Sequence, residues 1–297
     1  MSQGMIFDVK RFAIHDGDGI RTTLFFKGCP LSCVWCHNPE GISMKPEVAY
    51  YRHKCKCCGA CAKACPEGAH SFTEGGHIFD RDKCLGRGEC EAVCPNSAIK
   101  YYGRQVTADE ILPELLSDRA FYENSGGGVT LSGGECLMQA DFAAEILSRL
   151  KEEGIHTAVD TSGYVPREAF DKVLPYTDVF LYDVKAIDPA VHKRCTGRDN
   201  SLILNNLKYI SSRGAAIEIR IPFVPGYNDS EITAIAEFLD TVGGITKIKV
   251  LPYHNLAASK YEALGMKNTL PERVPTDEEL KSAISAIRSA APLSHLR

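Results

Sequence analysis

Three closely spaced cysteines offer the clearest chemistry in this chain of 297 residues: Cys29, Cys33 and Cys36, in the pattern Cys-x3-Cys-x2-Cys. Thiolates are the ligands that iron–sulfur clusters prefer, and a cubane cluster needs four ligands. Three cysteines on one short loop therefore leave one iron open. The alternative is a zinc site with His37 as fourth ligand, but zinc modules usually use paired Cys-x2-Cys arms that are well separated in sequence. The loop predicts an iron–sulfur cluster that takes part in chemistry.

A second group of cysteines follows, with the spacing of a bacterial ferredoxin. Its first half is Cys-x2-Cys-x2-Cys-x3-Cys-Pro, and its second half is Cys-x5-Cys-x3-Cys-Pro. In such pairs the last cysteine of each half serves the other cluster. Crossed ligation gives one cluster Cys55, Cys58, Cys61 and Cys94, and the other Cys84, Cys90 and Cys65.

The second of these predicted clusters lacks a thiolate, because Arg87 occupies the position of a fourth cysteine. Two outcomes stay open: a complete cubane with an unusual ligand, or a three-iron or labile cluster. Cys57 is the nearest spare thiol, or a bystander. Two such clusters suggest an electron relay. The alternative is that they only stabilise a segment that is too small to form its own hydrophobic core.

Polar residues come directly after several strand-like runs, where the carboxyl ends of parallel strands would bring them together. Each of these residues alone could be a helix cap or a surface charge. Together, at one end of the barrel, the acids, the lysine, the arginine and the histidine would suit a zwitterionic nucleoside. These groups are Ser132-Gly133-Gly134-Glu135, Asp160-Thr161-Ser162-Gly163, Asp183-Val184-Lys185, Arg220, and Tyr253-His254.

The elements that must position these residues are short strands separated by helix-length stretches. Apolar residues at helical spacing, such as Phe142, Ile146 and Leu150, support helices between them. Alternating strands and helices predict an α/β fold with parallel βαβ units, and six of them predict a partial (βα)6 TIM-like barrel. The predicted strands are Thr22–Lys27, Val129–Ser132, Thr157–Thr161, Val179–Val184, Ala216–Pro222 and Lys247–Pro252.

Residues 46–101 do not continue the alternation of strands and helices, since they contain many cysteines, glycines and lysines and almost no periodic apolar face. We expect an inserted ferredoxin-like iron–sulfur domain there. Residues 1–45 would begin the barrel and carry the cluster loop, and residues 102–297 would complete it.

Composition excludes several classes. The net charge of -4 and the absence of a basic run argue against a nucleic-acid-binding protein. Charged residues among the first twenty argue against a signal peptide. The sequence contains no apolar run of 18 residues, so it predicts no membrane-spanning helix. Eleven of the thirteen cysteines lie between residues 29 and 94 in metal-binding spacings, which suits a reducing compartment. We expect a cytoplasmic protein without a membrane partner.

Together these motifs resemble the glycyl radical enzyme activating enzymes of the radical S-adenosylmethionine (SAM) superfamily, a group that includes the pyruvate formate-lyase activating enzyme, and within it the members with a ferredoxin insert. The resemblance covers nearly the whole chain. The matching segments are 16–22, 28–38, 132–135, 160–163, 183–185, 224–228 and 251–254. Asp18 and Cys136 stand where the family commonly has proline, and neither change removes a ligand.

The resemblance implies a SAM site on the open iron. Gly133, Gly134 and Glu135 would lie near the SAM amino group, and Lys185 and His254 near its carboxylate. The implied site also includes Trp35, His37, Ser132, Thr161, Asp183, Val184 and Arg220. Asp160 and Asp183 would help to bind a monovalent cation, and Asp16 would line the groove for the partner.

The implied reaction begins when a flavodoxin or ferredoxin-type reductant supplies an electron, through the insert, to a site-differentiated 4Fe-4S cluster. SAM is then cleaved to methionine and a 5′-deoxyadenosyl radical, which takes a hydrogen atom from a backbone glycine of a partner glycyl radical enzyme. The cofactors would be SAM, the loop cluster, one or two accessory clusters and the cation. The alternatives are a radical SAM enzyme that acts on a small molecule or peptide, a non-enzymatic electron carrier, and a zinc-stabilised binding module.

Overall fold

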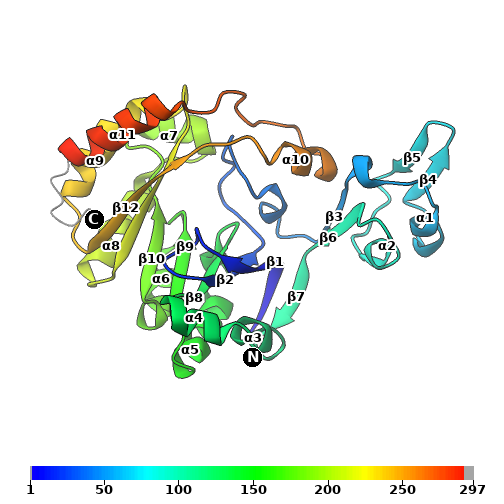
Figure 1. Cartoon of the computed structure of the whole chain (residues 1–297), viewed down its shortest axis with the longest axis horizontal. Helices are drawn as coiled ribbons and strands as arrows, with labels where there is room; N and C mark the ends of the chain where they lie inside the picture. Colours follow the sequence, from blue (N-terminus) through cyan, green and yellow to red (C-terminus); the bar gives the residue numbers. More distant parts are fainter. Residues whose placement is uncertain (1, 291–297) are drawn as a thin grey trace.

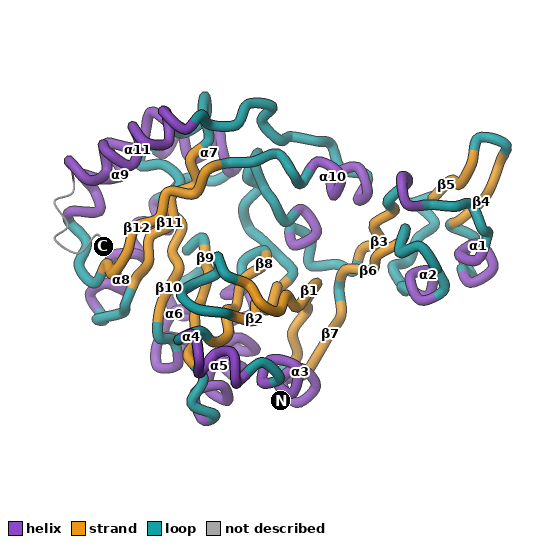
Figure 2. Tube along the Cα trace, viewed as in Figure 1, coloured by secondary structure: helices purple, strands orange, loops and turns teal. Residues whose placement is uncertain are grey.

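The computed structural model describes residues 2–290 and is built around one eight-stranded sheet in the order β12-β11-β10-β9-β8-β2-β1-β7 (Figures 1 and 2). Neighbouring strands from β2 to β12 are parallel, whereas β1 pairs antiparallel with both β2 and β7. The strands of this sheet are β1 (Gln3–Ala13), β2 (Arg21–Phe26), β7 (Arg104–Thr107), β8 (Gly128–Gly133), β9 (His156–Thr161), β10 (Val179–Asp183), β11 (Ile217–Phe223) and β12 (Ile245–Pro252).

The six parallel strands are those that the sequence predicted, with ends that differ by at most two residues. The α/β fold and the partial barrel are therefore confirmed. The antiparallel extension by β1 and β7 was not predicted from the sequence. β1 carries exposed charged residues such as Asp8 and Arg11, so it lacks the short apolar run that marked the parallel strands.

Helices connect the parallel strands and pack against the sheet with an apolar core between the two layers. Leu24, Val129 and Ile219 of the sheet belong to the same buried cluster as Ile146 of α5 and Ile235 of α9. The helices of this part are α3 (Ala108–Leu116), α4 (Arg119–Ser125), α5 (Ala140–Glu152), α6 (Arg167–Val173), α7 (Pro189–Thr196), α8 (Ser201–Ser212), α9 (Ile232–Asp240), α10 (Ala258–Leu264) and α11 (Asp277–Ala290).

The first of these helices, α3, begins at a capping box. The side chain of Thr107 accepts from the backbone N–H of Glu110, and the Glu110 carboxylate accepts from the N–H of Thr107 at 2.7 Å. This reciprocal cap satisfies two N–H groups that no helical bond reaches, so it fixes where the chain leaves β7 and re-enters the helical layer.

The cysteine-rich segment projects from one side of the sheet, on the right in Figure 1. Its base is the antiparallel pair β3 (Glu47–Tyr50) and β6 (Ile99–Tyr102), and its outer part holds two short helices and a hairpin. These elements are α1 (Ala60–Ala64), α2 (Glu89–Ala92), β4 (His70–Thr73) and β5 (Gly76–Phe79). Ala49 and Tyr102 at the base pack with Phe7 of β1 and with Ala263 and Leu264 of α10.

None of the helices between residues 2 and 290 has the length and apolar character needed to cross a membrane.

Candidate active site and accessory cluster sites

A cavity of about 330 Å³ lies at the carboxyl ends of the parallel strands. All three loop cysteines line it, together with polar residues from the ends of β8, β9, β10 and β11. The predicted site residues in its wall are Asp16, Cys29, Cys33, Trp35, Cys36, His37, Ser132, Gly133, Gly134, Asp160, Thr161, Asp183, Lys185 and Arg220. The topology thus brings together residues that are more than 200 positions apart in the chain.

The three-cysteine loop is itself neither helix nor strand, and hydrogen bonds from its backbone hold it in place. The N–H of Cys29 donates to the carbonyl of Ile42 at 3.0 Å, and that of Val34 to the carbonyl of Cys195 at 2.9 Å. Gly28 enters the loop with φ of +95°, a conformation that favours glycine, and an added Cβ there would meet Met44. The loop is therefore ordered by contacts with two distant segments.

Helix α10 fixes the far end of the loop. The Tyr261 hydroxyl donates to the carbonyl of Cys36 at 3.1 Å, and the Lys260 ammonium donates to the carbonyl of His37 at 3.0 Å. Lys260 also pairs with the buried carboxylate of Glu40 at 2.5 Å. Sequence reasoning missed this clamp, because nothing in the local pattern of residues 258–264 connects it with the loop.

The loop thiols suit an iron–sulfur cluster. Burial raises the pKa of Cys29 well above the ordinary value for a thiol, raises that of Cys33 as well, and raises that of Cys36 to about 12. Neighbouring loop cysteines raise the pKa of Cys29 and Cys36 further. Adjacent buried thiolates need cationic metal to be stable. Three thiols at one wall of an open cavity fit a cluster with one iron left for a small ligand.

Asp160 lies beside a hydroxyl and a guanidinium in the cavity wall. Its Oδ2 accepts from the Ser132 hydroxyl at 2.6 Å, and its Oδ1 lies 3.4 Å from the Arg220 guanidinium. Burial raises the pKa of Asp160 to about 6, with the Arg220 charge lowering it and the Asp183 charge raising it. Arg220 is anchored in turn by donating to the carbonyl of His15 at 2.7 Å.

Lys185 is the second cation in the wall, and its side chain is 6% exposed. Its ammonium lies 2.6 Å from Asp183 Oδ2. Burial opposes the charge of Lys185, but Asp183 and Cys33 together raise its pKa above the ordinary value. The cavity therefore presents a fixed positive charge beside the cysteine loop and carboxylates on neighbouring strands.

Glu135 lies behind the wall and does not line the cavity. Its carboxylate is fully buried and accepts from the Thr161 hydroxyl at 2.8 Å, the Ser162 hydroxyl at 2.6 Å, and the backbone N–H groups of Ser162 and Leu137. Burial raises the pKa of this carboxyl, and the Ser162 and Thr161 hydrogen bonds lower it. Its visible role is to position the segment after β9.

Two further predicted residues lie outside the cavity wall. Val184 is buried, and its N–H donates to the carbonyl of Arg220 at 2.9 Å, which joins the ends of β10 and β11. His254 is exposed and stacks on His37 with ring centroids 4.0 Å apart. His37 also contacts the carbonyl of His254 through Nε2 at 2.7 Å, so the pair forms part of the rim.

The two remaining predicted side chains hold different parts of the wall. Asp16 accepts from the Thr23 hydroxyl at 2.8 Å and lies at the turn between β1 and β2. Trp35 is buried and belongs to an apolar cluster with Val224 and Tyr253. Trp35 therefore packs the cysteine loop against the ends of β11 and β12.

Sequence reasoning missed the apolar part of the wall, including Phe25, Leu31 and Ile42. It also assigned no role to Asn228, which is fully buried and donates to the carbonyls of Lys185 at 2.8 Å and Pro222 at 2.6 Å. The signal available was its place in the segment 224–228 after β11. Asn228 holds the cavity ends of β10 and β11 together.

The insert contains two small cavities, each of about 20 Å³ and lined by cysteines. The first is lined by Cys55, Cys58, Cys61 and Cys94, which is one of the two sets that crossed ligation predicts. Phe72 and Ile99 complete an apolar wall around them. Four thiols around one cavity fit a cubane cluster.

The second cavity is lined by Cys65, Cys84 and Cys90, together with Glu67, His70 and Arg87. Arg87 Nε lies 2.8 Å from Glu67 Oε1. The spare Cys57 is exposed and lines neither cavity. The second site therefore has three thiols and an ion pair.

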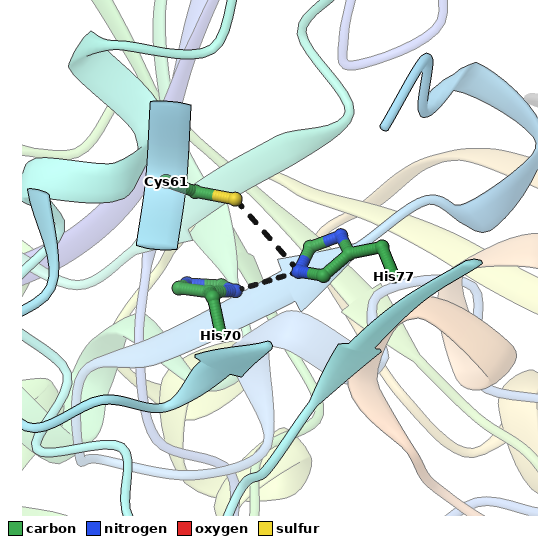
Figure 3. Close-up of side chains that lie close together, drawn as sticks. All are labelled: Cys61, His70 and His77. Atoms are coloured by element: carbon green, nitrogen blue, oxygen red, sulfur yellow. Dashed lines mark hydrogen bonds between the residues drawn. The ribbon is translucent and has the colours of Figure 1, made fainter. Parts of the chain in front are cut away.

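Two buried histidines lie between the two cavities, His77 lining the first and His70 the second, and Figure 3 shows them with Cys61. His70 Nδ1 is 3.0 Å from His77 Nε2, and His77 Nδ1 is 3.5 Å from Cys55 Sγ. Burial lowers the pKa of both histidines, that of His70 to about 4, so both rings are neutral near pH 7. Because Cys61 also belongs to the four-cysteine set, we interpret His77 as a neighbour of the first cluster rather than as part of a separate metal site.

Comparison with known families matches residues 82–239 to the Radical SAM superfamily and residues 54–98 to the 4Fe-4S dicluster domain. The chain is 43% identical to the choline trimethylamine-lyase activating enzyme of Oleidesulfovibrio alaskensis, over 89% of this chain and 87% of that protein. It is 43% identical to the (2S)-3-sulfopropanediol sulfolyase activating enzyme of Bilophila wadsworthia, over 93% of each. It is 41% identical to the trans-4-hydroxy-L-proline dehydratase activating enzyme of Clostridioides difficile, also over 93% of each.

Proposed function

The chain belongs to the activating enzymes of glycyl radical enzymes within the radical SAM superfamily, and from this membership we propose that the 330 Å³ cavity is where it binds and cleaves SAM. These enzymes install a glycyl radical on a partner protein. A free electron carrier, a zinc module and a radical enzyme for small molecules are not favoured by such relatives.

The observation that carries the proposal is the joint placement of three thiols and two opposite-charge pairs around one cavity. Cys29, Cys33 and Cys36 form one wall, while the pairs Asp160–Arg220 and Asp183–Lys185 stand on neighbouring strands. A ligand that carries an amino group, a carboxylate and a sulfonium needs this kind of mixed charge around it.

In this proposal the 4Fe-4S cluster bound by the three loop cysteines supplies, when present, the electron that cleaves the carbon–sulfur bond of SAM. The residues of the chain bind, orient and shield the ligand. Lys185 attracts the SAM carboxylate, and the backbone of Gly133 and Gly134 approaches its amino group, where no side chain obstructs it. Asp160 and Asp183 offset the positive charge of the sulfonium and are the proposed ligands of a monovalent cation.

Other predicted residues take supporting roles in the proposal. Glu135 holds Thr161 and Ser162 in place through its hydrogen bonds, and Arg220 orients Asp160. His37 and His254 together form a stacked rim over the cluster loop. Shielding the cavity matters because a carbon radical must take only the intended hydrogen atom.

The substrate of the radical is a glycine on a loop of a separate glycyl radical enzyme, which would enter past Asp16. The relatives named above activate a carbon–nitrogen lyase, a sulfolyase and a dehydratase, so the chemistry of the partner differs while the glycine is common to all. We propose that the part of the cavity near Asp16 receives this loop.

We further propose that a flavodoxin or ferredoxin-type reductant delivers electrons through the insert. Helix α10 connects the two parts, because Ala263 and Leu264 pack against the base of the insert while Tyr261 donates to the cysteine loop. Neither accessory cavity has room for an organic ligand, which suits electron transfer rather than catalysis.

Anaerobic assay of SAM cleavage tests the site. The enzyme reconstituted with iron and sulfide and given dithionite should form 5′-deoxyadenosine, whereas Cys33→Ser should form none. Cys57→Ser is the matched control, since Cys57 is an exposed cysteine outside all three cavities, and it should keep the activity. Product formation by Cys33→Ser would refute the assignment of the loop.

A further inference from the structure

We propose that the second accessory site, the cavity lined by Cys65, Cys84 and Cys90, binds a three-iron [3Fe–4S] cluster, whereas the first binds a four-iron cluster. The inference rests on the proposed assignment of the insert as a holder of two clusters, and it goes beyond it by fixing the composition of the second one.

The two halves of the insert repeat in backbone as well as in sequence. Helix α1 begins after Gly59, which has φ of +78°, and α2 begins after Gly88, which has φ of +86°. Cys58 precedes the first of these glycines and Arg87 precedes the second. Arg87 in the second half is therefore equivalent to Cys58 in the first half, and Cys58 lines the first cavity.

Arg87 cannot replace a thiolate. A guanidinium has no lone pair to offer a metal. Arg87 lines the second cavity and holds Glu67 through Nε at 2.8 Å. The corner where the fourth iron would be bound is thus lined by a cation, which disfavours an additional iron cation there.

Two other polar side chains of the second cavity, Glu67 and His70, already have partners. Glu67 is paired with Arg87, and its carboxylate is a hard ligand for a site that the thiolates make soft. His70 uses Nδ1 to contact His77 of the first site at 3.0 Å, and its ring stacks on Phe79. Cys57 does not reach this cavity.

The cysteine loop of the barrel also has three thiols, but its surroundings differ. There the missing corner opens onto a cavity of about 330 Å³ that can admit an organic ligand. The second accessory cavity encloses about 20 Å³ and offers no such space. Three thiolates match the three irons of a [3Fe–4S] cluster, so no further ligand is required there.

The test uses the full chain with Cys29, Cys33 and Cys36 all replaced by serine, because the loop cluster also has three thiolates and could give the same spectrum. After anaerobic reconstitution we expect about seven irons per chain, four in the first site and three in the second. A [3Fe–4S] cluster is paramagnetic when oxidised, so the oxidised protein should give an electron paramagnetic resonance signal. That signal should disappear on one-electron reduction.

Arg87→Cys in this background supplies the fourth thiolate. It should raise the iron content to about eight and abolish the oxidised-state signal, while the reduced protein gains a second four-iron signal. Arg87→Ser is the matched control, which removes the guanidinium without adding a thiolate and should keep the three-iron signal.

Two results would overturn the proposal, and they differ from each other. About eight irons without an oxidised-state signal in the chain that retains Arg87 would mean a complete cubane. Loss of its fourth iron in Glu67→Gln would then assign the ligand to Glu67. About four irons with no response to Arg87→Cys would mean that the insert holds one cluster, which would refute the two-cluster assignment as well.

Discussion

Asp160, which is partly buried, and Lys185, which is buried, carry opposite charges at the ends of neighbouring strands, and their partners determine how each behaves. Lys185 stays protonated beside Asp183, whereas Asp160 is a carboxyl group whose pKa burial raises to about 6 despite the nearby Arg220. Only Asp160 of these two therefore changes charge near neutral pH. A ligand with net positive charge, such as SAM, should sense that change.

SAM affinity should rise with pH through the pKa of Asp160. Because the ionised form attracts the sulfonium, binding to the cluster-loaded enzyme should tighten severalfold, up to about tenfold, between about pH 5 and pH 7. Asp160→Asn keeps an oxygen that can accept from Ser132 but cannot titrate. Anaerobic calorimetry should show that this variant lacks the pH-dependent part of the affinity, and identical profiles for both proteins would contradict the role of Asp160.

For individual residues, the sequence predicted which of them lie near the cavity better than it predicted where each side chain points. Asp160 and Lys185 follow strands and line the wall, as expected. Glu135 also follows a strand, but its carboxylate turns to the hydroxyls of Thr161 and Ser162. The segments that hold these hydroxyls come from another strand, so the local sequence of β8 could not reveal the contact.

Among the elements, α10 is the one that connects the cysteine loop with the insert. Glu40 is 3% exposed, and its carboxylate depends on Lys260, since within residues 2–290 its Oε2 has no hydrogen-bond partner. Loss of the ammonium would leave a buried charge without compensation.

Lys260→Met should therefore lower the free energy of unfolding by about 2 kcal/mol and loosen the end of the loop. Anaerobic urea denaturation should show a lower midpoint, and the double variant with Glu40→Gln should recover part of it because the unpaired charge is gone. Lys267→Met, at an exposed lysine just beyond α10, is the control and should leave the midpoint unchanged. Equal midpoints for Lys260→Met and the control would contradict the clamp.

Most of the parallel strands were predictable because both of their faces are buried, which produces short apolar runs that end in polar residues. β1 was not predictable in this way, since one face is exposed and its charges interrupt the run. The contact of Tyr261 with Cys36 joins residues 225 positions apart, and only the closed fold brings them together.

The whole molecule combines a barrel that holds the proposed SAM site with an insert that holds the proposed relay. The strands at the base of the insert pair antiparallel, with Tyr50 opposite Ile99. Ala49 of β3 and Tyr102 of β6 pack with Ala263 and Leu264 of α10, so we expect them to stay packed there when the outer part is absent. This geometry allows the relay to be removed without exposing the core of the barrel.

Replacing residues 51–98 by an Asn-Gly turn should close β3 and β6 into a hairpin. We expect the shortened enzyme to fold, to keep the loop cluster and to cleave SAM with dithionite. Its activity with a flavodoxin or ferredoxin should fall at least about tenfold, because the relay is missing. Full activity with the protein reductant would contradict the relay, and Cys55→Ser in the complete chain separates loss of a cluster from loss of the whole insert.

The most direct measurement of the central claim is electron paramagnetic resonance of a glycyl radical enzyme incubated anaerobically with this protein, SAM and a reductant. The partner to test is a glycyl radical enzyme from the organism that encodes this chain. A doublet from a glycyl radical should form with the unmodified enzyme and with Cys57→Ser, and should be absent with Cys33→Ser and without SAM. A doublet that forms equally well with Cys33→Ser, or no doublet although SAM is cleaved, would contradict the account.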